Sequence, residues 1–312
     1  MKKLSLGQIS DYEIKQLKVF KTVVECGGFS AAAAELNISR PTVSNHIASL
    51  ESRLGMTLCK RGRSGFILSA EGSVVYEQTN LLLDQMDQFR NTINNLGDSP
   101  NGVLRIALSD TFSTDQRCKI PEIYSKFCKL APNVTLKVEV EHMSDMERQI
   151  LNDQLDLAFI PYHRKLEGLH YIHLFTDNNY LHCGRGHPFF DLDEDDISID
   201  IINKAKLIHA GLQPHEEIYQ NLSQMNLSGS SYHYESRIGL ILSGEYICFL
   251  PEEVARPYVE GGQLRVFGRD KKHFALGAAV IFKHNHKPNR AKELFIRVIQ
   301  DCFSGAVMQA PY

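Results

Sequence analysis

The chain has 312 residues, of which 43% are hydrophobic and 23% charged, as in a soluble protein of two or three domains. No basic segment leads into an apolar run, and no stretch approaches the roughly 18 apolar residues of a membrane span. The seven cysteines are scattered and form no C-x-x-C pair, which is typical of reduced thiols. The composition therefore excludes an exported or membrane protein and predicts a cytoplasmic one.

The net charge of -3 is unevenly distributed along the chain. Residues 1–70 hold ten Lys and Arg against five Asp and Glu, a net charge of +5, so the remainder carries -8. A basic N-terminal segment on an acidic body is typical of a protein that binds nucleic-acid phosphates through one end.

Residues 29–50 have the pattern of a helix-turn-helix. A short alanine-rich helix is followed by a break at residues 37–39 and by a second helix. Ser30 and Ser39 are placed to cap these two helices, and Pro41 suits the first turn of the second. The apolar residues of the second helix recur at spacings of four, three and four, which predicts one buried face: Val43, Ile47, Leu50 and Leu54.

The opposite face of the second helix is polar and free of acidic residues. A helix-turn-helix places such a face in the DNA major groove. Asn45 suits adenine, Arg40 suits guanine, and His46 suits a base or a phosphate. The alternative is an ordinary helical hairpin within a larger core. We expect DNA contacts from Ser30, Ser39, Arg40, Pro41, Thr42, Ser44, Asn45 and His46.

Residues 58–69 read as two short strands around a glycine-rich turn, which completes a predicted DNA-binding domain over residues 12–69. Lys60, Arg61 and Arg63 make this hairpin basic. Next to a helix-turn-helix, such a hairpin acts as a wing that reaches a flanking phosphate or the minor groove. We therefore add Arg61 and Arg63 to the expected DNA contacts; the alternative is a solvated surface turn.

Residues 70–97 predict one long helix with a heptad seam. The seam residues are Val75, Thr79, Leu82, Met86, Phe89, Ile93 and Leu96. A lone helix cannot bury this seam, so we expect a dimerisation helix that joins two chains through Val75, Leu82, Met86, Phe89 and Ile93. The alternative is packing against the chain's own C-terminal body. Residues 98–102, rich in Gly and Pro, read as a hinge.

From residue 103 onward strands and helices alternate, which predicts an α/β body with parallel strands and crossover helices. The pattern restarts after residue 175, and the last section rejoins the first sheet. We therefore expect two subdomains around a cleft, residues 103–174 with 266–312 and residues 175–265. The expected strands include residues 104–108, 133–141, 155–161, 231–236, 246–251 and 275–284, and the expected helices include residues 115–130, 145–152, 214–226, 238–244 and 288–303.

These features together resemble the LysR-type transcriptional regulators over nearly the whole chain. The similarity rests on LKVFKTVVECGGFSAAAAELNISRPTVSNHIASLESRLGMTLCKR (residues 17–61) and LSAEG (68–72), and on LRIAL, LDLAF, HPF and GEYICFLP in the body. The resemblance implies an α/β protein with an N-terminal winged helix-turn-helix, a linker helix, and a C-terminal effector domain of two subdomains with a periplasmic-binding-protein-like fold.

The resemblance also implies a regulator and not an enzyme, without a cofactor. Its expected partners are double-stranded DNA with a two-fold symmetric operator, a small-molecule effector, and copies of itself in a homodimer that assembles into a homotetramer. RNA polymerase is a further partner that such a regulator allows.

The family's effector lies at the carboxyl ends of the strands and between the subdomains, where open α/β sheets bind ligands. The matching positions are Ser109, Thr111, Ser113, Ser144, Pro161, His209, Glu235 and Arg237. Hydroxyl groups just before a helix suit an anion, so we hypothesise a carboxylate effector. Simple capping of the local helix is the alternative for each hydroxyl.

Two other functions stay open from the residues alone. The first is a regulator of the same fold that senses redox state through a cysteine thiol. The second is an enzyme or solute-binding protein with an incidental helix-turn-helix. The thirteen histidines and the acidic run at residues 191–200 lack ligand spacing, so we predict no metal site.

Overall fold

The computed structural model describes residues 7–62, 65–94, 99–211, 219–220, 222–284 and 289–304. The chain divides into two compact units, Met1–Arg90 and Asn91–Tyr312, which are treated separately below. Within the described ranges, none of the helices combines the length and the apolar character needed to span a membrane.

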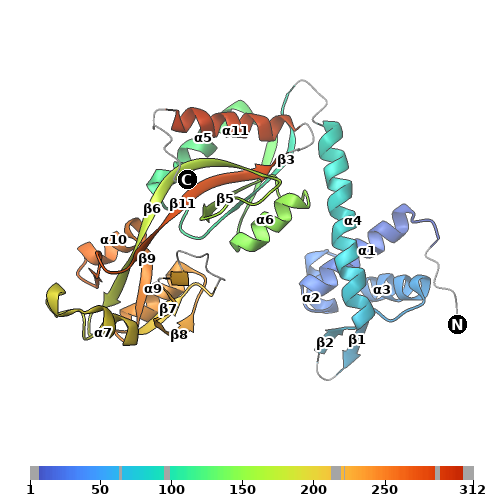
Figure 1. The fold of residues 1–312 in the computed structure, drawn as a ribbon. Coiled ribbons are helices and arrows are strands. Elements are labelled where there is room, and N and C mark those ends of the chain that lie inside the picture. Colours follow the sequence, from blue (N-terminus) through green and yellow to red (C-terminus); the bar gives the residue numbers. More distant parts are fainter. Residues whose placement is uncertain are drawn as a thin grey trace. The chain divides into compact units, whose positions relative to one another are not determined.

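The first unit has the predicted winged helix-turn-helix (Figure 1). Its elements are α1 (Asp11–Glu25), α2 (Phe29–Glu35), α3 (Arg40–Leu54), β1 (Cys59–Gly62), β2 (Gly65–Leu68) and the start of α4 (Ala70–Asn94). The predicted face of α3 forms the centre of the core, since Val43, Ile47 and Leu50 are buried. Phe20 of α1 and Ala32 of α2 pack against them, and the small alanine side chain allows the helices to cross closely.

The two helix starts differ from each other. Ser39 caps α3, because its hydroxyl oxygen accepts from the backbone N–H of Thr42 at 3.3 Å. The predicted cap by Ser30 is wrong. The helix α2 begins two residues earlier than a Ser30 cap would require, at Phe29, with Gly28 in the capping position and without a side-chain cap. Gly28 has a φ of 155°, which glycine adopts readily, and Phe29 is drawn into the core, so Ser30 lies inside the helix.

The wing is fixed to α3 by one carboxylate. Oε1 of Glu51 accepts from the backbone N–H groups of Leu58 at 2.7 Å and Cys59 at 3.2 Å. Helix α4 then passes so close to this strand that a Cβ at Gly72 would lie 1.9 Å from the carbonyl oxygen of Leu58. Only glycine fits this approach, so the sequence AEG at the start of α4 sets how the long helix leaves the wing.

The predicted seam of α4 has two different environments. In its first half, Val75 and Leu82 pack against the core of the first unit, and Thr79 is 2% exposed. In its second half, Met86, Phe89 and Ile93 are 39%, 70% and 50% exposed. Val75 and Leu82, which were predicted to join two chains, therefore pack against the core of their own unit. The predicted seam residue Leu96 lies outside the described residues.

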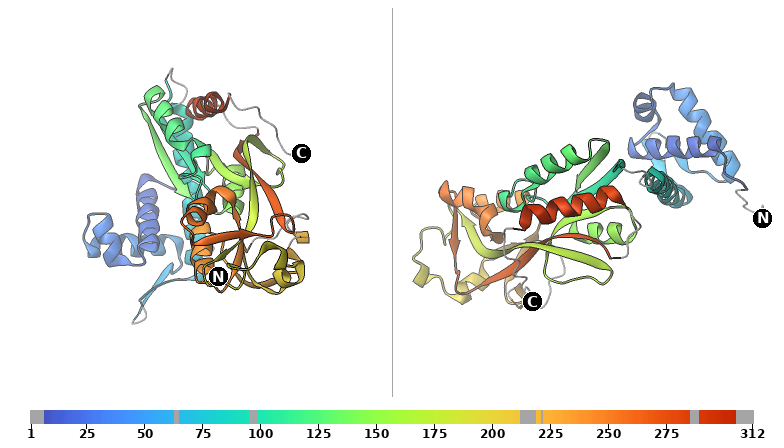
Figure 2. Two further views of the ribbon diagram at one scale, coloured as in Figure 1. Left: turned by 90° about the vertical axis from the view of Figure 1, so that its left-hand side faces the viewer. Right: turned by 90° about the horizontal axis from the view of Figure 1, so that it is seen from above.

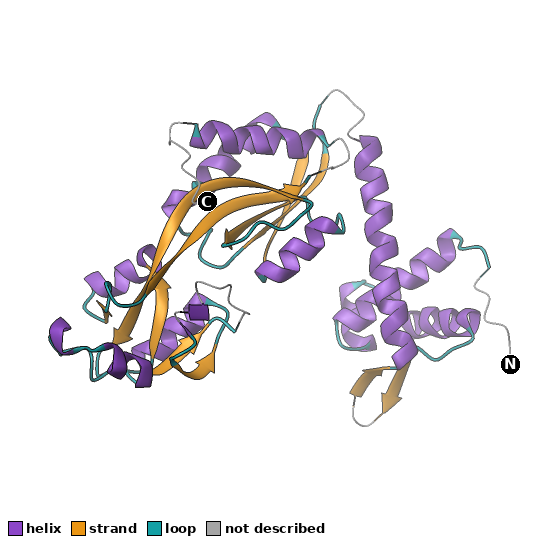
Figure 3. Ribbon diagram, viewed as in Figure 1, coloured by secondary structure: helices purple, strands orange, loops and turns teal. Residues whose placement is uncertain are grey.

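Among its described residues, the second unit contains one sheet of nine strands in the order β4-β3-β5-β11-β6-β9-β7-β8, with β10 paired to β6. One half has the parallel strands β4 (Val134–Val140), β3 (Gly102–Leu108) and β5 (Leu157–Tyr162), and the other has the parallel strands β9 (Ile247–Pro251), β7 (Lys206–His209) and β8 (Asn226–Ser230). The long antiparallel strands β6 (Leu169–Gly184) and β11 (His273–Lys283) join the halves (Figure 3).

Helices cover both faces of each half. In the first half, α5 (Ile120–Leu130) and α11 (Arg290–Phe303) lie side by side on one face, and α6 (Met143–Leu151) lies on the other (Figure 2). In the second half, α7 (Ile199–Lys204) packs in one core, and α9 (Tyr234–Leu242) and α10 (Glu252–Glu260) pack in another. The remaining described elements are the short helices η1 (Gln116–Cys118) and η2 (Glu194–Asp196) and the strand β10 (Leu264–Phe267).

Two predictions for the body are corrected by the structure. Residues 231–236 are not a strand, because β8 ends at Ser230 and α9 begins at Tyr234. The predicted subdomain boundary at residue 266 falls inside β10, whose four residues all pair with β6 in the second half. The helix α10 was not predicted. Most of the predicted helix at residues 214–226, and residue 98 of the predicted hinge, lie outside the described residues.

Candidate functional site

The polar face of α3 is the candidate DNA surface of the first unit. Arg40, Pro41, Thr42 and Asn45 are exposed, whereas Ser44 is half-buried. Ser39, also exposed, uses its hydroxyl within the helix, 2.8 Å from the hydroxyl of Thr42. Ser30 is exposed on α2. This face presents hydrogen-bonding groups at the start of a recognition helix, as base and phosphate contacts require.

The surroundings of His46 and of the wing residues differ from those of the exposed residues of α3. The half-buried ring of His46 lies 6.1 Å from the ring of Tyr12 in α1, and its Nδ1 is buried without a partner among the described residues. The ring of His46 therefore lies next to α1, and is less available than its exposed neighbours for a contact in a DNA groove. Arg61 belongs to β1 of the wing, and Arg63 lies outside the described residues.

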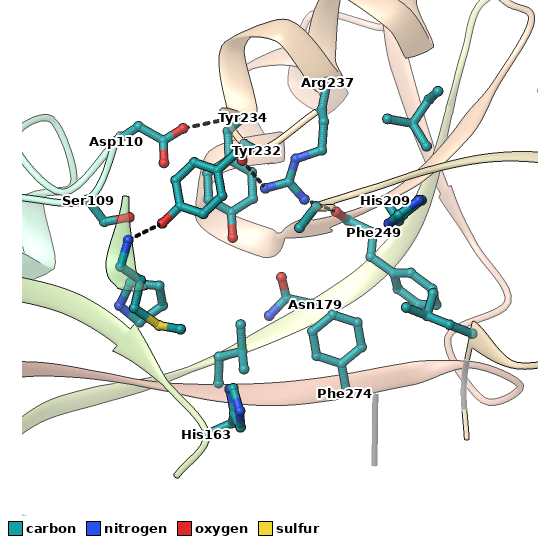
Figure 4. A pocket seen from close by; sticks show the side chains of 16 residues that line it. Ser109, Asp110, His163, Asn179, His209, Tyr232, Tyr234, Arg237, Phe249 and Phe274 are labelled. Atoms are coloured by element: carbon teal, nitrogen blue, oxygen red, sulfur yellow. Dashed lines mark hydrogen bonds between the residues drawn. The ribbon is translucent and has the colours of Figure 1, made fainter. Parts of the chain in front are cut away.

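A cavity of about 110 Å³ lies between the two halves of the second unit (Figure 4). The first half contributes Ser109, Asp110, Met143, Pro161 and His163, and the remaining lining residues are Asn179, Ile208, His209, Ala210, Leu222, Tyr232, Tyr234, Arg237, Phe249, Phe274 and Leu276. Most of this wall is apolar, with a small number of converging polar groups, which is the usual character of a small-molecule site.

The predicted effector residues divide into three groups. Ser109, Pro161, His209 and Arg237 line this cavity. Thr111 and Glu235 line a neighbouring, more open cavity of about 610 Å³. Ser113 and Ser144 are absent from the described lining of both. The strand ends that carry these residues do converge, but nearby residues of one loop, such as Ser109 and Thr111, face different cavities.

Arg237 is the cationic group of the cavity wall, which also contains the carboxylate of Asp110, and the side chain of Arg237 is only 7% exposed. Its Nη2 donates to the carbonyl oxygen of Tyr232 at 3.1 Å and its Nη1 to that of Phe249 at 3.5 Å. Its Nε has no hydrogen-bond partner among the described residues. The guanidinium also lies 4.0 Å from the centre of the Tyr234 ring. Nearby anionic and polar groups raise the pKa of Arg237 despite its burial, so it stays charged.

His209 is a neutral hydrogen-bond donor on the same wall. Burial, and then the charge of Arg237, lower its pKa below the ordinary value. Its Nδ1 accepts from the backbone N–H of Gly211 at 3.1 Å, so the proton is on Nε2. Asn179, which is 2% exposed, adds an amide from β6 that points toward the middle of the cavity (Figure 4). The cavity thus combines a guanidinium, an N–H donor, an amide and the carboxylate of Asp110.

Five polar residues of the cavity were missed from the sequence: Asp110, His163, Asn179, Tyr232 and Tyr234. Asp110 directly follows Ser109, so the predicted loop carried a signal for it. Asn179 is in the middle of a long strand, and Tyr232 is in a segment predicted as a strand. Only the crossing of β6 between the halves brings Asn179 to the cavity.

Four of the seven cysteines have the properties of inert thiols in the described structure. Cys183 and Cys248 are buried in the second half, and Cys118 and Cys302 are buried in the first. Burial raises the pKa of Cys183 to about 12, and it raises the pKa values of the other three as well. Reactive cysteines need an accessible thiolate, which these environments disfavour.

Comparison with known proteins matches both units. Residues 14–73 match the bacterial regulatory helix-turn-helix proteins of the lysR family, and residues 97–304 match the LysR substrate binding domain. The chain is 34% identical over 295 residues to the HTH-type transcriptional activator BauR of Pseudomonas aeruginosa, which covers 95% of this chain and 97% of the relative. It is 26% identical over 260 residues to the SDS degradation transcriptional activation protein of a Pseudomonas species, with coverages of 81% and 83%.

Solved structures share the fold. The crystal structure of full-length CbnR complexed with its target DNA has a TM-score of 0.66 at 17% identity, over 92% of this chain and 98% of that one. The full-length structure of the Vibrio cholerae virulence activator AphB has a TM-score of 0.58 at 16% identity, over 92% and 98%.

Proposed function

The chain belongs to the LysR family of bacterial transcriptional regulators, and on this premise we propose that its effector is a small carboxylate bound in the cavity between the two halves. The first unit binds DNA and the second binds the effector, as the two family domains imply. The carboxylate is our inference from the chemistry of the cavity wall.

The buried guanidinium of Arg237 carries this proposal. Asp110 lines the same cavity and acts on Arg237 through its charge, but among the described residues no acidic side chain forms an ion pair with Arg237, which donates to two carbonyl oxygens. A charge this deeply buried is costly unless a counter-charge meets it. A ligand carboxylate would supply that counter-charge, with Nε2–H of His209 and the amide of Asn179 as further partners.

The volume of the cavity supports a small effector. A dry cavity of about 150 Å³ holds one benzene molecule. The cavity here is about 110 Å³, so we infer a carboxylate with few non-hydrogen atoms unless the halves move apart. The apolar side chains of Phe249, Phe274 and Leu276 favour a hydrocarbon part next to the charged group.

For the assembly we propose a homodimer through α4 that pairs into a homotetramer on a two-fold symmetric operator. The exposed Met86, Phe89 and Ile93 support a helix partner for the second half of α4. Two relatives are named as activators, which favours activation by this chain, and activation makes RNA polymerase a further partner.

The redox alternative receives less support. The raised pKa values of the buried cysteines make slow thiolate chemistry the expectation. If peroxide changed the affinity of the protein for DNA, and a Cys128→Ser variant with the exposed thiol removed did not respond, the thiol would be the sensor and the carboxylate proposal would need revision.

A screen of the full chain tests the carboxylate proposal. Thermal unfolding is followed with acetate, butyrate, succinate and benzoate, each against sodium chloride at the same ionic strength. A binder raises the unfolding temperature by mass action, and we expect at least one small carboxylate to do so. The same compound should change a gel shift on the DNA upstream of the regulator's gene. Stabilisation by amines or neutral sugars, and by none of the carboxylates, would contradict the proposal.

A further inference from the structure

Helices α6 and α9 begin at the same cavity, and each begins against the opposite half. The first N–H of α6, on Met143, donates to the hydroxyl oxygen of Tyr232 at 2.8 Å. The first N–H of α9, on Tyr234, donates to Oδ2 of Asp110 at 2.6 Å. Because Asp110 and Met143 belong to the first half and Tyr232 and Tyr234 to the second, each half caps a helix of the other. We call these two hydrogen bonds the reciprocal caps.

Two histidine rings lie beside the reciprocal caps. His142 and His233 directly precede α6 and α9, and neither caps its own helix through its side chain. The ring of His142 stacks on the ring of Tyr232, with centroids 3.7 Å apart, and meets the ring of His233 at 5.4 Å. Nδ1 of His233 lies 3.8 Å from Oδ2 of Asp110. The starts of the two helices are therefore held face to face by side chains from both halves.

The two caps differ in charge. Asp110 places a carboxylate at the start of α9, where the helix dipole favours a negative charge. Tyr232 places a phenol at the start of α6, and burial raises the pKa of this hydroxyl, so it stays neutral at physiological pH. Ser109, which is 2% exposed, lines the cavity beside the same phenol. The uncharged oxygen of Tyr232 therefore lies on the cavity wall next to two hydrogen-bonding groups, the N–H of Met143 and the hydroxyl of Ser109.

We propose that Tyr232 occupies the position of the effector's carboxylate, so that its hydroxyl joins the two halves in the absence of effector and the effector displaces it from Ser109 and Met143. This inference rests on the proposed carboxylate function. Hydrogen bonds from a backbone N–H to a charged oxygen are about twice as strong as neutral ones, so a carboxylate outcompetes the phenol at this position. Its displacement breaks one reciprocal cap and thereby links binding to the arrangement of the halves.

Arg237 connects the two parts of the site. Its Nη2 donates to the backbone carbonyl oxygen of Tyr232 at 3.1 Å, so the residue to be displaced is bonded to the cationic group of the cavity. A carboxylate that approaches Arg237 competes for that donor as well. The effector thus competes with two hydrogen bonds of Tyr232, one at its hydroxyl and one at its backbone carbonyl oxygen.

The variant Tyr232→Phe tests this inference, because it keeps the ring that stacks on His142 and removes only the oxygen. Without its competitor, we expect the full-length variant to bind the stabilising carboxylate, or acetate as the simplest probe, about 2- to 12-fold more tightly than the wild type, the range that one net hydrogen bond contributes. Ser109→Ala should weaken the same binding, because the ligand loses a partner. Tyr246→Phe, which removes a hydroxyl elsewhere in the second half, is the control and should leave binding unchanged.

A second measurement needs no ligand. Exchange of the Met143 amide hydrogen should be about 2- to 12-fold faster in Tyr232→Phe than in the wild type. Equal or weaker carboxylate binding by Tyr232→Phe would overturn the competition and leave Tyr232 as mere support for the cavity. If no carboxylate binds either protein, the proposed function fails and the competition with it. An unchanged exchange rate of the Met143 amide hydrogen would separately refute the proposal that the hydroxyl of Tyr232 joins the two halves.

Discussion

The guanidinium of Arg237 lies 4.0 Å from the centre of the Tyr234 ring, on the wall of the cavity between the two halves. The ring face stabilises the cation in part, which lets the charge remain buried before an anion arrives. The contact also orients Arg237, whose other bonds go to carbonyl oxygens of the second half. The second half therefore carries the positive charge of Arg237, and the first half forms the opposite wall of the cavity.

Replacing Arg237 by Met should weaken carboxylate binding without lowering the stability of the ligand-free protein. The lost charge-assisted hydrogen bonds contribute about 1.5–3 kcal/mol, so the affinity should fall roughly 10- to 100-fold in calorimetric titration. The stability of the ligand-free protein should stay equal or rise, because a similar apolar side chain replaces a buried charge. Arg256→Met, at a half-exposed arginine paired with Glu253, is the control. A large loss of stability in Arg237→Met without ligand would make Arg237 a structural residue.

Arg61→Ala should weaken DNA binding to a similar extent for all sequences. Arg61 lies on β1 of the wing, where we expect a phosphate contact. Losing one such contact lowers the slope of log K against log salt by about 0.9. Fluorescence anisotropy with an operator and a scrambled duplex over a salt series measures both effects. Lys21→Ala removes a positive charge from α1 and should leave the slope unchanged. A change in base preference would instead assign Arg61 to base contacts.

Phe89→Glu should break the proposed contact through α4 and lower the mass of the assembly in solution. Phe89 is 70% exposed at the centre of the free half of the α4 seam, and two opposed carboxylates in a coiled-coil seam would repel each other. Sedimentation velocity measures the mass directly. Leu81→Glu makes the same kind of substitution at a residue that is 44% exposed but off the seam, and it should keep the mass of the wild type. If both variants kept the wild-type mass, the subunits would associate through another surface.

The parts of the fold that were predictable depend on short-range patterns. The spacing of Val43, Ile47 and Leu50 alone gave the buried face of α3, and all three are at most 1% exposed. Alternation of strands and helices gave the two-half body in the same way. Ser30 was misassigned because the choice of helix start depends on the burial of Phe29, which is a tertiary effect.

The parts that were not predictable depend on contacts between distant residues. Residues 231–236 carry no local helix signal at their start, because the N–H of Tyr234 is capped by Asp110, which lies 124 positions earlier in the chain. The same crossing of the halves brings Tyr232 to Met143 and Asn179 into the cavity. Local sequence patterns therefore predict only some of the residues of a site that lies between two halves.

The buried imidazole of His182 should make the body lose stability in mild acid. His182 is 2% exposed on β6, and its Nδ1 lies 2.8 Å from the carbonyl oxygen of Tyr180. Burial lowers its pKa to about 4 from an ordinary value near 6.5. Between these values the unfolded chain binds a proton that the native protein excludes. The stability from this site is therefore complete above pH 6.5 and is lost as the pH falls toward 4, by about 3 kcal/mol in total.

The variant His182→Asn isolates this effect. Its side-chain N–H replaces the donor at Nδ1 toward Tyr180, and it does not titrate in this range. Urea unfolding at about pH 7.5 and about pH 5 should show a smaller loss of stability in the variant than in the wild type. The remaining loss should reflect His187 and His209, whose pKa values burial also lowers. An equal loss in both proteins would mean that the native structure admits a proton at His182, and that water reaches this part of β6.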